Sequence, residues 1–420
     1  MGRRPRAVVV ATGSELVRGE IVDRNGPFLA REALRLGLEP ARILVVGDDP
    51  AELEAALREG FAADACLVSG GLGPTHDDRT VELAARVAGV PLRVDEDVRA
   101  EIETFSRAIA DRLRRDYAEF EAGVVKQATI PEGATVIGLA GTAPGLVLDA
   151  GGAVVVILPG PPPELQRLWP AALASEPFRR LLARARPPER RVLRFFGASE
   201  SAVAGALAAV GGEPDGVEVT ICARDFEIHV DLVVDPDAEA AADELETRLA
   251  APLEEWLFAR DDDPVEAHVL ELCRARGLTL ATAESCTGGL VAARLTSVPG
   301  SSDVFVGSVV AYANEVKEHE LGVPPATLAK RGAVSRETAA AMAEGVRERL
   351  GADVAVSVTG VAGPGGGTPE KPVGLVYLHA LSPDGERAQR FELPGDREAI
   401  RQRAAALALH LVRRLLANPG

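Results

Sequence analysis

Short apolar segments alternate with amphipathic segments along the first third of the chain. The apolar segments cover residues 7–12, 43–47 and 65–69, and residues 28–36 and 51–60 between them carry apolar side chains at helical spacing. Strands that are apolar on both faces are typical of a parallel sheet that helices cover on each side. The pattern therefore predicts an α/β domain at this end of the chain.

A glycine-rich turn follows the strand expected at residues 65–69. It reads GGLGPTHDD over residues 70–78 and precedes a helix expected at residues 81–88. Such a turn presents backbone N–H groups to a phosphate. Asp77 and Asp78 could hold a divalent metal ion beside that phosphate, or they could cap the helix, which is the commoner role of aspartate there.

A second strand-to-helix junction, TAESCTGG at residues 282–289, carries a serine and a cysteine side by side. The apolar residues 278–281 before it indicate a strand, and residues 290–295 after it have helical spacing. A hydroxyl or thiol at such a junction faces free backbone N–H groups and the positive end of the helix dipole, which would stabilise an oxyanion. An ordinary N-cap followed by a tight turn is the alternative interpretation.

Two further segments are expected to meet this junction. Residues 304–312 (VFVGSVVAY) indicate a buried strand followed by a helix at residues 314–321, and residues 354–359 indicate a strand that ends at the glycine-rich loop 360–367 (GVAGPGGG). In open α/β sheets, ligands bind outside the carboxyl ends of the strands. The side chains expected to line one pocket there are Ser285, Tyr312, Lys317 and Thr359.

The attacking group in such a pocket could be Ser285 or Cys286. Cysteine is the more nucleophilic type, but it usually works with a histidine, and His319 stands two residues beyond Lys317 and therefore on another helix face. Serine would pair with Lys317, whose pKa must then fall from ~10.4 to ~7–8, a shift that costs about 4 kcal/mol and needs a desolvated pocket. Tyr312 could relay the proton or orient the amine. The residue types alone favour Ser285 only slightly.

Composition argues against several classes of function. The chain has 420 residues, of which 47% are hydrophobic, so two or three domains with real cores are expected. A formal net charge of −17 argues against a nucleic-acid surface, which needs clustered Lys and Arg. Four widely spaced cysteines without a CxxC pair indicate neither a zinc site nor a disulfide framework. Neither a transmembrane run nor a signal-peptide h-region is found, so we expect a soluble cytoplasmic protein without membrane contact.

The middle of the chain differs in composition. A stretch rich in Arg and Pro at residues 183–191 marks a boundary, and the acidic residues 261–264 mark the next linker. Between them the pattern predicts a small α+β unit that ends in a helix over residues 238–257. A unit of this size suits a spacer or a contact between two copies of the chain.

Four motifs in the C-terminal part point to a known family. They are ATAESCTGG, PGSSDVFVGSVVAYANEVKEHELGV, GAVSRETAAAMAEGV and SVTGVAGPGGGTPEKPVG. From about residue 265 onward the chain resembles the C-terminal domain of the competence/damage-inducible protein A (CinA) family, which is an α/β/α sandwich. The resemblance implies a nicotinamide mononucleotide (NMN) deamidase, which hydrolyses the carboxamide of NMN to nicotinic acid mononucleotide and ammonia without a cofactor.

The same resemblance implies roles for single residues. Those implied in catalysis are the nucleophile and its base, Ser285 and Lys317, and two supporting residues, Tyr312 and Thr359. An arginine near the C-terminal helix is also implied, for which Arg397 and Arg401 are equal candidates. Backbone N–H groups near Thr287 and Gly288 would hold the oxyanion, while the glycine-rich loop and an arginine would hold the phosphate and ribose. The expected substrate-binding residues are Thr287, Gly288, Gly289, Gly363, Arg397 and Arg401.

Six motifs relate the N-terminal part to the same family. They are TGSELVRGEIVDRN, VVGDDP, SGGLGPTHDDRT, KQATIPEGA, GTAPG and LPGPPPEL. Over roughly residues 5–170 the chain resembles the N-terminal domain of CinA proteins, which is related to molybdopterin-binding domains of the MoaB/Mog type. The resemblance implies a metal-dependent ADP-ribose pyrophosphatase that yields AMP and ribose 5-phosphate. Shortly before GTAPG the family often has Asn-Pro where this chain has Gly138-Leu139, so the contacts of that loop do not carry over.

A pyrophosphatase must neutralise the charge of two phosphates and place a water molecule in line. Under the resemblance the neutralising ion would be Mg²⁺, or Co²⁺ or Mn²⁺ in its place, with K⁺ as an optional further ion. The carboxylates expected to hold it are Asp23, Asp78 and Glu164, and Asp78 is also expected to act on the hydrolytic water. The expected substrate-binding residues are Asn25, Gly70, Gly71, Gly73, Thr75, Thr142 and Gly160.

These expectations describe a bifunctional hydrolase of pyridine-nucleotide salvage in three domains. The expected domains are a MoaB/Mog-like one at 1–170, an α+β connecting one at 171–257 and the deamidase at 258–420. The resemblance gives the connecting domain a KH-type fold, but its glycine turn is acidic, so RNA binding is not expected. The family also implies a homodimer. Two alternatives stay open: an N-terminal domain that only binds a molybdopterin-like ligand, and a non-catalytic accessory with a competence or recombination protein as partner.

Overall fold

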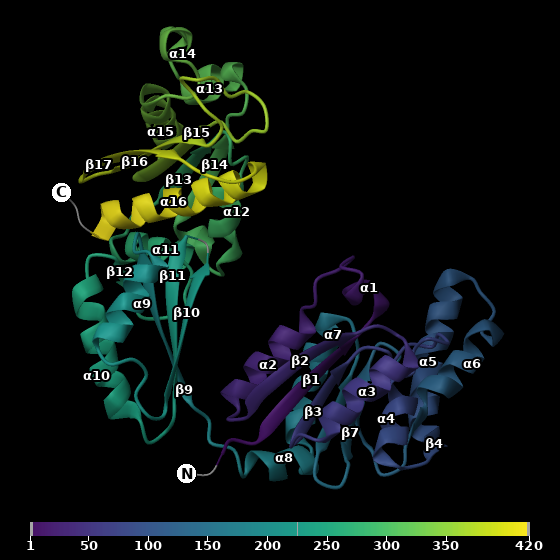
Figure 1. Ribbon diagram of the computed structural model, residues 1–420. Coiled ribbons are helices and arrows are strands. Elements are labelled where there is room, and N and C mark those ends of the chain that lie inside the picture. The colour runs from purple at the N-terminus through teal and green to yellow at the C-terminus, as the bar shows by residue number, and fades with distance from the viewer. Residues whose placement is uncertain (1–2, 225, 418–420) are drawn as a thin grey trace. The chain divides into compact units, whose positions relative to one another are not determined.

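The computed structural model describes residues 3–224 and 226–417 (Figure 1). The chain divides into two compact units. Unit 1 runs to Arg190 and includes Asp215–Val217 and Val233–Ala240. Unit 2 holds Arg191–Pro214, Glu218–Leu232 and the chain from Ala241 onward.

Unit 1 is built on a six-stranded sheet that is mostly parallel. Its strands, in order across the sheet, are β2 (Glu39–Val46), β1 (Arg6–Thr12), β3 (Ala65–Ser69), β8 (Val154–Leu158), β7 (Ala143–Asp149) and β6 (Thr135–Ala140). The first four run parallel, and β7 is antiparallel to both of its neighbours. A separate antiparallel pair joins β4 (Leu92–Val94) to β5 (Thr129–Pro131). The α/β class predicted from the apolar strands is confirmed.

Helices cover both faces of this sheet because successive strand residues point to opposite sides. In β1, Ala7 and Val9 belong to the core under one set of helices, whereas Val8 and Val10 belong to the core under the other. The first set is α2 (Asn25–Arg35), α7 (Pro162–Ala174) and α8 (Glu176–Leu182), and the second is α3 (Pro50–Phe61) and α4 (Thr80–Ala88). The remaining helices are α1 (Ser14–Val17), α5 (Glu96–Leu113) and α6 (Ala118–Gln127).

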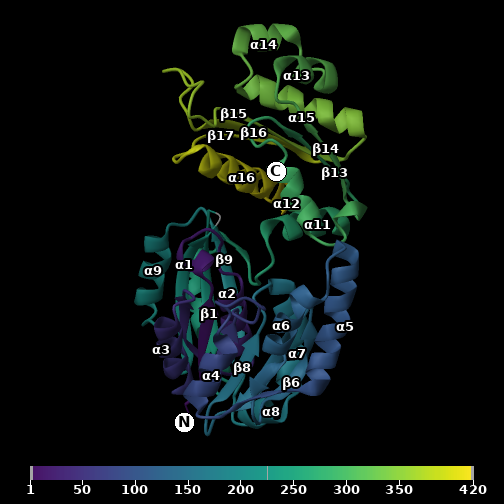
Figure 2. The ribbon, with the colours of Figure 1, turned by 90° about the vertical axis from the view of Figure 1, so that its right-hand side faces the viewer.

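Unit 2 contains a five-stranded sheet in an α/β/α sandwich (Figure 2). Its strands, in order, are β14 (Phe305–Val310), β13 (Leu280–Glu284), β15 (Val354–Gly360), β16 (Leu375–Ser382) and β17 (Gly385–Glu392). The first three are parallel and the last two antiparallel. One face packs on α11 (Val265–Ala275), α12 (Leu290–Ser297) and α16 (Arg397–Ala417), and the other on α13 (Asn314–Leu321), α14 (Pro325–Arg331) and α15 (Arg336–Leu350). A 3₁₀ turn, η2 (Ser301–Asp303), precedes β14.

The middle of the chain makes a four-stranded sheet, most of which belongs to unit 2. Its order is β10 (Val217–Arg224), β11 (Glu227–Val234), β9 (Glu189–Phe196) and β12 (Leu257–Ala259), with helices α9 (Glu200–Ala209) and α10 (Glu239–Ala250) and the 3₁₀ turn η1 (Ala251–Leu253). The helix predicted over residues 238–257 is therefore too long. It ends because Pro252 has no backbone N–H to continue the helix, and the chain passes through η1 into β12. The KH-type likeness of this region stays a prediction.

The strand predicted as buried over residues 304–312 is an edge strand. Among the described strands β14 pairs only with β13, and Val306 and Val310 on it are 47% and 45% exposed. Apolar composition does not separate an edge strand from a central one, since both carry the same β-branched residues. Within residues 3–224 and 226–417, no helix combines the length and apolar character that a bilayer crossing requires.

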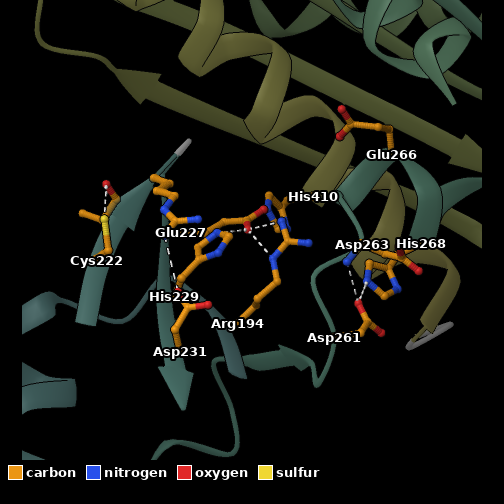
Figure 3. A network of polar contacts seen from close by, with 12 residues as sticks. Arg194, Cys222, Glu227, His229, Asp231, Asp261, Asp263, Glu266, His268 and His410 are labelled. Atoms are coloured by element: carbon orange, nitrogen blue, oxygen red, sulfur yellow. Dashed lines mark hydrogen bonds and ion pairs between the residues drawn. The ribbon is translucent and has the colours of Figure 1, made fainter. Parts of the chain in front are cut away.

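A buried polar network ties the four-stranded sheet to α16 (Figure 3). Glu227 accepts hydrogen bonds from His410 at 2.7 Å, from Arg194 at 2.9 Å, and lies 3.1 Å from His229. The His410 ring stacks on Phe196 with a centroid separation of 3.6 Å. Burial alone would raise the pKa of Glu227, but the bonds from the two histidines and the Arg194 charge lower it, whereas burial lowers the pKa of His410 to about 4. His410 is therefore neutral at pH 7, and Glu227 with Arg194 forms the buried ion pair.

Replacing the acceptor of this network tests how much it stabilises unit 2. Glu227→Gln leaves Arg194 buried without its counter-charge, which should lower the free energy of unfolding by about 3 kcal/mol. Urea unfolding followed by far-UV circular dichroism measures the loss. The matched control is Glu244→Gln, which removes an exposed carboxylate paired with Arg248 and should leave stability nearly unchanged. Equal stability of the two variants would contradict the stabilising role of the network.

Candidate active site

Ser285 and Lys317 meet at the carboxyl end of the five-stranded sheet. Lys317 Nζ on α13 lies 3.1 Å from Ser285 Oγ, which directly follows β13. The Ser285 N–H donates to the carbonyl of Val358 at 2.9 Å, so strand pairing with β15 extends to the serine itself. The parallel strands β14, β13 and β15 all end here, and the structure therefore brings together the serine and lysine that the sequence placed in one pocket.

Lys317 is buried among neutral oxygens. Its side chain is 1% exposed, and Nζ donates to the carbonyls of Ala311 at 2.6 Å and Tyr312 at 3.2 Å. No carboxylate pairs with it among the described residues. Burial lowers the pKa of Lys317, as the sequence argument required. A neutral amine has two hydrogens for the two carbonyls, so its lone pair can accept the Ser285 proton.

Three N–H groups at the start of α12 already have a partner, so the expectation that a free helix N-terminus faces the nucleophile is wrong, while the role expected for the Thr287 N–H stays a prediction. The carboxylate of Glu284 accepts the N–H groups of Gly289, Val291 and Ala292 at 2.9, 3.1 and 2.8 Å. The N–H of Gly288, also expected to hold the oxyanion, donates to the Ser285 carbonyl at 3.1 Å. The sequence argument overlooked Glu284, although it directly precedes the serine.

Cys286 is buried and stays a thiol. Burial raises the pKa of Cys286 to about 12, and the negative charge of Glu284 acts in the same direction. Its Sγ packs so closely on Gly360 that a Cβ at that glycine would lie 3.1 Å away. Between the two candidates for the attacking group, these surroundings favour Ser285, because the thiolate is the nucleophilic form of cysteine.

Both candidate arginines reach the site from the first turns of α16. Arg397 donates to the Tyr312 hydroxyl at 2.9 Å and to the Gly363 carbonyl at 2.7 Å. Arg401 donates to the Thr287 carbonyl at 3.0 Å. Tyr312 is 61% exposed and contacts Lys317 through its backbone carbonyl, while its hydroxyl binds Arg397. The geometry therefore does not favour the proton relay considered for that hydroxyl.

Two threonines at the site differ in their hydrogen bonding. Thr359 donates its hydroxyl to the Ala333 carbonyl at 2.7 Å, so it fixes the loop that follows β15. The Thr287 hydroxyl is buried and has no partner within the described residues. Gly289 begins α12 with a φ of 97°, a backbone conformation that glycine adopts without strain. Sequence reasoning missed the Ala311 carbonyl, which binds Lys317. Every residue has a backbone carbonyl, so the residue type at position 311 could not have indicated this role.

Unit 1 has a separate cavity of about 380 Å³ at the carboxyl ends of β1, β3 and β8. The predicted residues that line it are Gly70, Gly71, Gly73, Asp78, Thr142, Gly160 and Glu164. A second cavity of about 630 Å³ is lined by Asp23 and Asn25 and shares Gly160 with the first.

Thr75 lines neither of these cavities, and its hydroxyl and N–H bind the carboxylate of Asp78. Sequence reasoning missed Glu15, Asp48 and Gln127 among the residues of the smaller cavity.

The three predicted metal ligands are not gathered around one point. Asp23 accepts the N–H groups of Asn25 and Gly26 at 2.9 and 3.0 Å, which holds the start of α2. Nowhere in residues 3–224 and 226–417 do three or more His, Cys, Asp or Glu side chains converge on a metal position. Asp78 and Glu164 line one cavity, and Mg²⁺ is often held by one or two carboxylates plus substrate phosphates. These two residues therefore fit such an ion only together with a phosphate ligand.

The carboxylates of the smaller cavity have different surroundings. Asp78 does not cap α4, because the N-cap residue of that helix is Arg79, no side chain makes a cap hydrogen bond there, and the Asp78 carboxylate binds Thr75 instead, so the capping alternative is wrong. A hydrogen bond from Thr75 lowers the pKa of Asp77. Burial raises the pKa of Glu164, and the positive charge of Arg167 offsets only part of this effect.

Fold and sites define a mixed α/β protein with a glycine-rich turn beside a cavity in one unit and a Ser–Lys pair in the other. Two family models match the chain, one described as CinA C-terminal domain over residues 262–416 and one as Probable molybdopterin binding domain over residues 8–177. A "CinA-like protein" of Mycobacterium tuberculosis (strain ATCC 25177 / H37Ra) is 43% identical over 99% of this chain and 98% of its own length. The chain belongs to the CinA family, which confirms the resemblance inferred from the motifs.

A second full-length relative agrees with this assignment. A "CinA-like protein" of Mycobacterium sp. (strain MCS) is 43% identical over 98% of this chain and 99% of its own length. Among solved structures, the competence/damage inducible protein CihA of Agrobacterium tumefaciens is 40% identical, with a TM-score of 0.36, and covers 38% of this chain and 100% of its own. The two family models leave residues 178–261 between them.

Alkylation of the cysteines tests whether Cys286 can act as a nucleophile. With a pKa of about 12, Cys286 is ionised to only about 1 part in 10⁴ at pH 8, and it is buried. Iodoacetamide at pH 8 should therefore modify Cys222, which is partly exposed, and leave Cys286 unmodified, as peptide mass spectrometry would show. Unfolding in guanidinium serves as the control, since all four cysteines should then react. Modification of Cys286 in the folded protein at the rate of Cys222 would contradict the assignment.

Proposed function

We propose that unit 2 hydrolyses the carboxamide of NMN to nicotinic acid mononucleotide and ammonia. The observation that carries the proposal is the 3.1 Å contact between Ser285 Oγ and a buried Lys317 amine that no carboxylate of the described residues neutralises. A serine nucleophile needs an adjacent base, and a lysine serves as one only when desolvation lowers its pKa. The family resemblance supplies the substrate.

The chemistry follows from the hydrogen bonds around Lys317. The neutral amine takes the Ser285 proton as Oγ attacks the carboxamide carbon, and the resulting ammonium gives that proton to the leaving nitrogen as the C–N bond breaks. Ammonia departs and an ester links the nicotinoyl group to Ser285. Water then attacks the ester, Lys317 takes the water's proton, and the proton returns to Ser285 Oγ as the acid product leaves. The Ala311 and Tyr312 carbonyls hold the amine in place throughout.

A mononucleotide fits the charge of the surroundings. Arg397 and Arg401 project from α16 toward the glycine-rich loop and the turn after Ser285. Guanidinium groups bind phosphate through paired N–H donors, and a glycine loop lets a ligand approach the backbone. We therefore assign the NMN phosphate and ribose to these arginines and to the loop around Gly363.

Two alanine variants test the nucleophile. Ser285→Ala should lower ammonia release from NMN by at least about 10³-fold, because the covalent route is lost. Cys286→Ala is the matched control and should retain most of the activity, since its thiol is buried and protonated. Full activity of Ser285→Ala with loss in Cys286→Ala would reverse the assignment. Absence of ammonia release in the wild type would favour a non-catalytic competence or recombination accessory.

We propose a second activity for unit 1, the hydrolysis of ADP-ribose to AMP and ribose 5-phosphate. Supporting this proposal, the cavity of about 380 Å³ places the glycine turn 70–73 beside Asp78 and Glu164. Glycine N–H groups suit the phosphates, and the two carboxylates would hold a divalent ion that offsets the phosphate charge. A molybdopterin-like ligand also carries phosphate and is the competing occupant.

Removing one carboxylate separates catalysis from ligand binding in unit 1. Asp78→Asn should lower AMP formation from ADP-ribose, with Mg²⁺ present, by about 10²-fold or more. The reason is that the ion loses a carboxylate ligand and the hydrolytic water loses the carboxylate that acts on it. Glu52→Gln, on the exposed first turn of α3, is the control and should keep full activity. The reaction is followed by chromatography of AMP. A wild type that forms no AMP with Mg²⁺, Mn²⁺ or Co²⁺ would contradict the proposal and favour pterin binding.

A further inference from the structure

Glu284 is a buried carboxylate next to the nucleophile, and the mechanism above does not use it. It is the last residue of β13, and its side chain is 0% exposed. No Lys, Arg or His forms an ion pair with it in the described part of the chain. Its partners are the three N–H groups at the start of α12 and, at 3.4 Å, the hydroxyl of Thr282.

These hydrogen bonds satisfy both the N–H groups at the start of α12 and the buried carboxylate of Glu284. The first N–H groups of a helix have no partner within the helix, and the helix dipole adds a partial positive charge there. A buried carboxylate is costly unless hydrogen bonds and opposite charge compensate it. Three charge-assisted bonds at 2.8–3.1 Å provide that compensation without a cation.

The same bonds close the segment that holds the nucleophile. The backbone of Glu284 pairs within the sheet as part of β13, and its side chain accepts hydrogen bonds from backbone N–H groups that begin at Gly289. Residues 285–288 therefore form a loop bridged at both ends by one residue. The Glu284 carbonyl also accepts the N–H of Ala311 at 2.8 Å, and the Ala311 carbonyl binds Lys317 at 2.6 Å.

We propose that Glu284 is a positioning residue that sets the orientation of Ser285 toward Lys317. Its side chain fixes the turn that carries the serine, and its main chain fixes the carbonyl that holds the amine. The inference rests on the Ser–Lys pair of the proposed function, but not on the identity of the substrate. It also assigns oxyanion stabilisation to donors outside the α12 N-terminus, because Glu284 already occupies the N–H groups of Gly289, Val291 and Ala292.

An amide cannot replace this carboxylate. In Glu284→Gln one oxygen acceptor remains, and the new NH₂ group faces backbone N–H donors, so at least one bond is lost and a repulsive contact replaces it. Glu284→Ala leaves all three donors buried and unpaired. Either change frees the turn at 285–288, and a displacement of about 1 Å at a reacting group costs about 10²-fold in rate.

The test measures the reactivity of Ser285 without NMN. The full-length protein is treated with a fluorophosphonate that labels activated serines, and the labelling rate of Ser285 is followed by mass spectrometry. Glu284→Gln and Glu284→Ala should label about 10- to 100-fold more slowly than the wild type. Ammonia release from NMN, measured in parallel, should fall through kcat with little change in KM.

Glu266→Gln is the matched control. Glu266, labelled in Figure 3, is also a buried carboxylate. It holds α12 through Arg294 at 2.9 Å, and within the described residues its side-chain hydrogen bonds go to that arginine and not to residues 285–288. This variant should lose thermal stability and still label within about twofold of the wild type. The comparison separates loss of stability from loss of orientation.

Three outcomes would overturn the inference. They are wild-type labelling rates in Glu284→Gln and Glu284→Ala, an equal loss in Glu266→Gln, and a wild-type Ser285 that does not label at all. Normal labelling of Ser285 with no hydrolysis of NMN would contradict the proposed substrate while the effect of Glu284 is still measured.

Discussion

The arrangement of unit 2 depends on one amine buried among neutral oxygens. A charged lysine in such surroundings would need a carboxylate, and none pairs with Lys317 in the described chain. Burial therefore lowers its pKa, and the carbonyls of Ala311 and Tyr312 fix its direction. The parallel strands β14, β13 and β15 make this possible, because their carboxyl ends deliver the carbonyls, the serine and the glycine loop to one edge.

The start of α12 shows how a helix N-terminus can serve structure rather than catalysis. Its N–H groups would be available to an anionic intermediate if the preceding residues were neutral. Glu284 occupies them instead, and its charge also helps to keep Cys286 protonated. One carboxylate thus holds the serine in place and adds to the burial that keeps the neighbouring thiol protonated.

Much of this architecture was predictable from the sequence, and the exceptions share a cause. Strand apolarity and helical spacing located the parallel sheets, and the order of the strands implied that Ser285 and Lys317 would meet, which they do at 3.1 Å. The sequence could not show that the Asp23 carboxylate binds backbone N–H groups at the start of α2. Nor could it show that the Tyr312 hydroxyl accepts a hydrogen bond from Arg397. The hydrogen-bond partner of a polar side chain depends on which other polar groups lie close enough in the folded protein to compete for it. Neighbouring residue types do not determine that competition.

The two units place similar loops in opposite electrostatic surroundings. In each, a glycine-rich segment follows a buried strand at the carboxyl edge of a parallel sheet, β3 in unit 1 and β15 in unit 2. Arg397 from α16 binds the second loop at the Gly363 carbonyl, whereas Asp77, Asp78 and Glu164 accompany the first, to which Lys126 also binds at the Thr75 carbonyl. A phosphate can bind beside arginines directly, but beside carboxylates it must bring a cation to offset the repulsion. The side chains around the loops, rather than the loops themselves, therefore set the charge that a bound phosphate would meet, and the metal ion proposed for unit 1 follows from the carboxylates of its cavity.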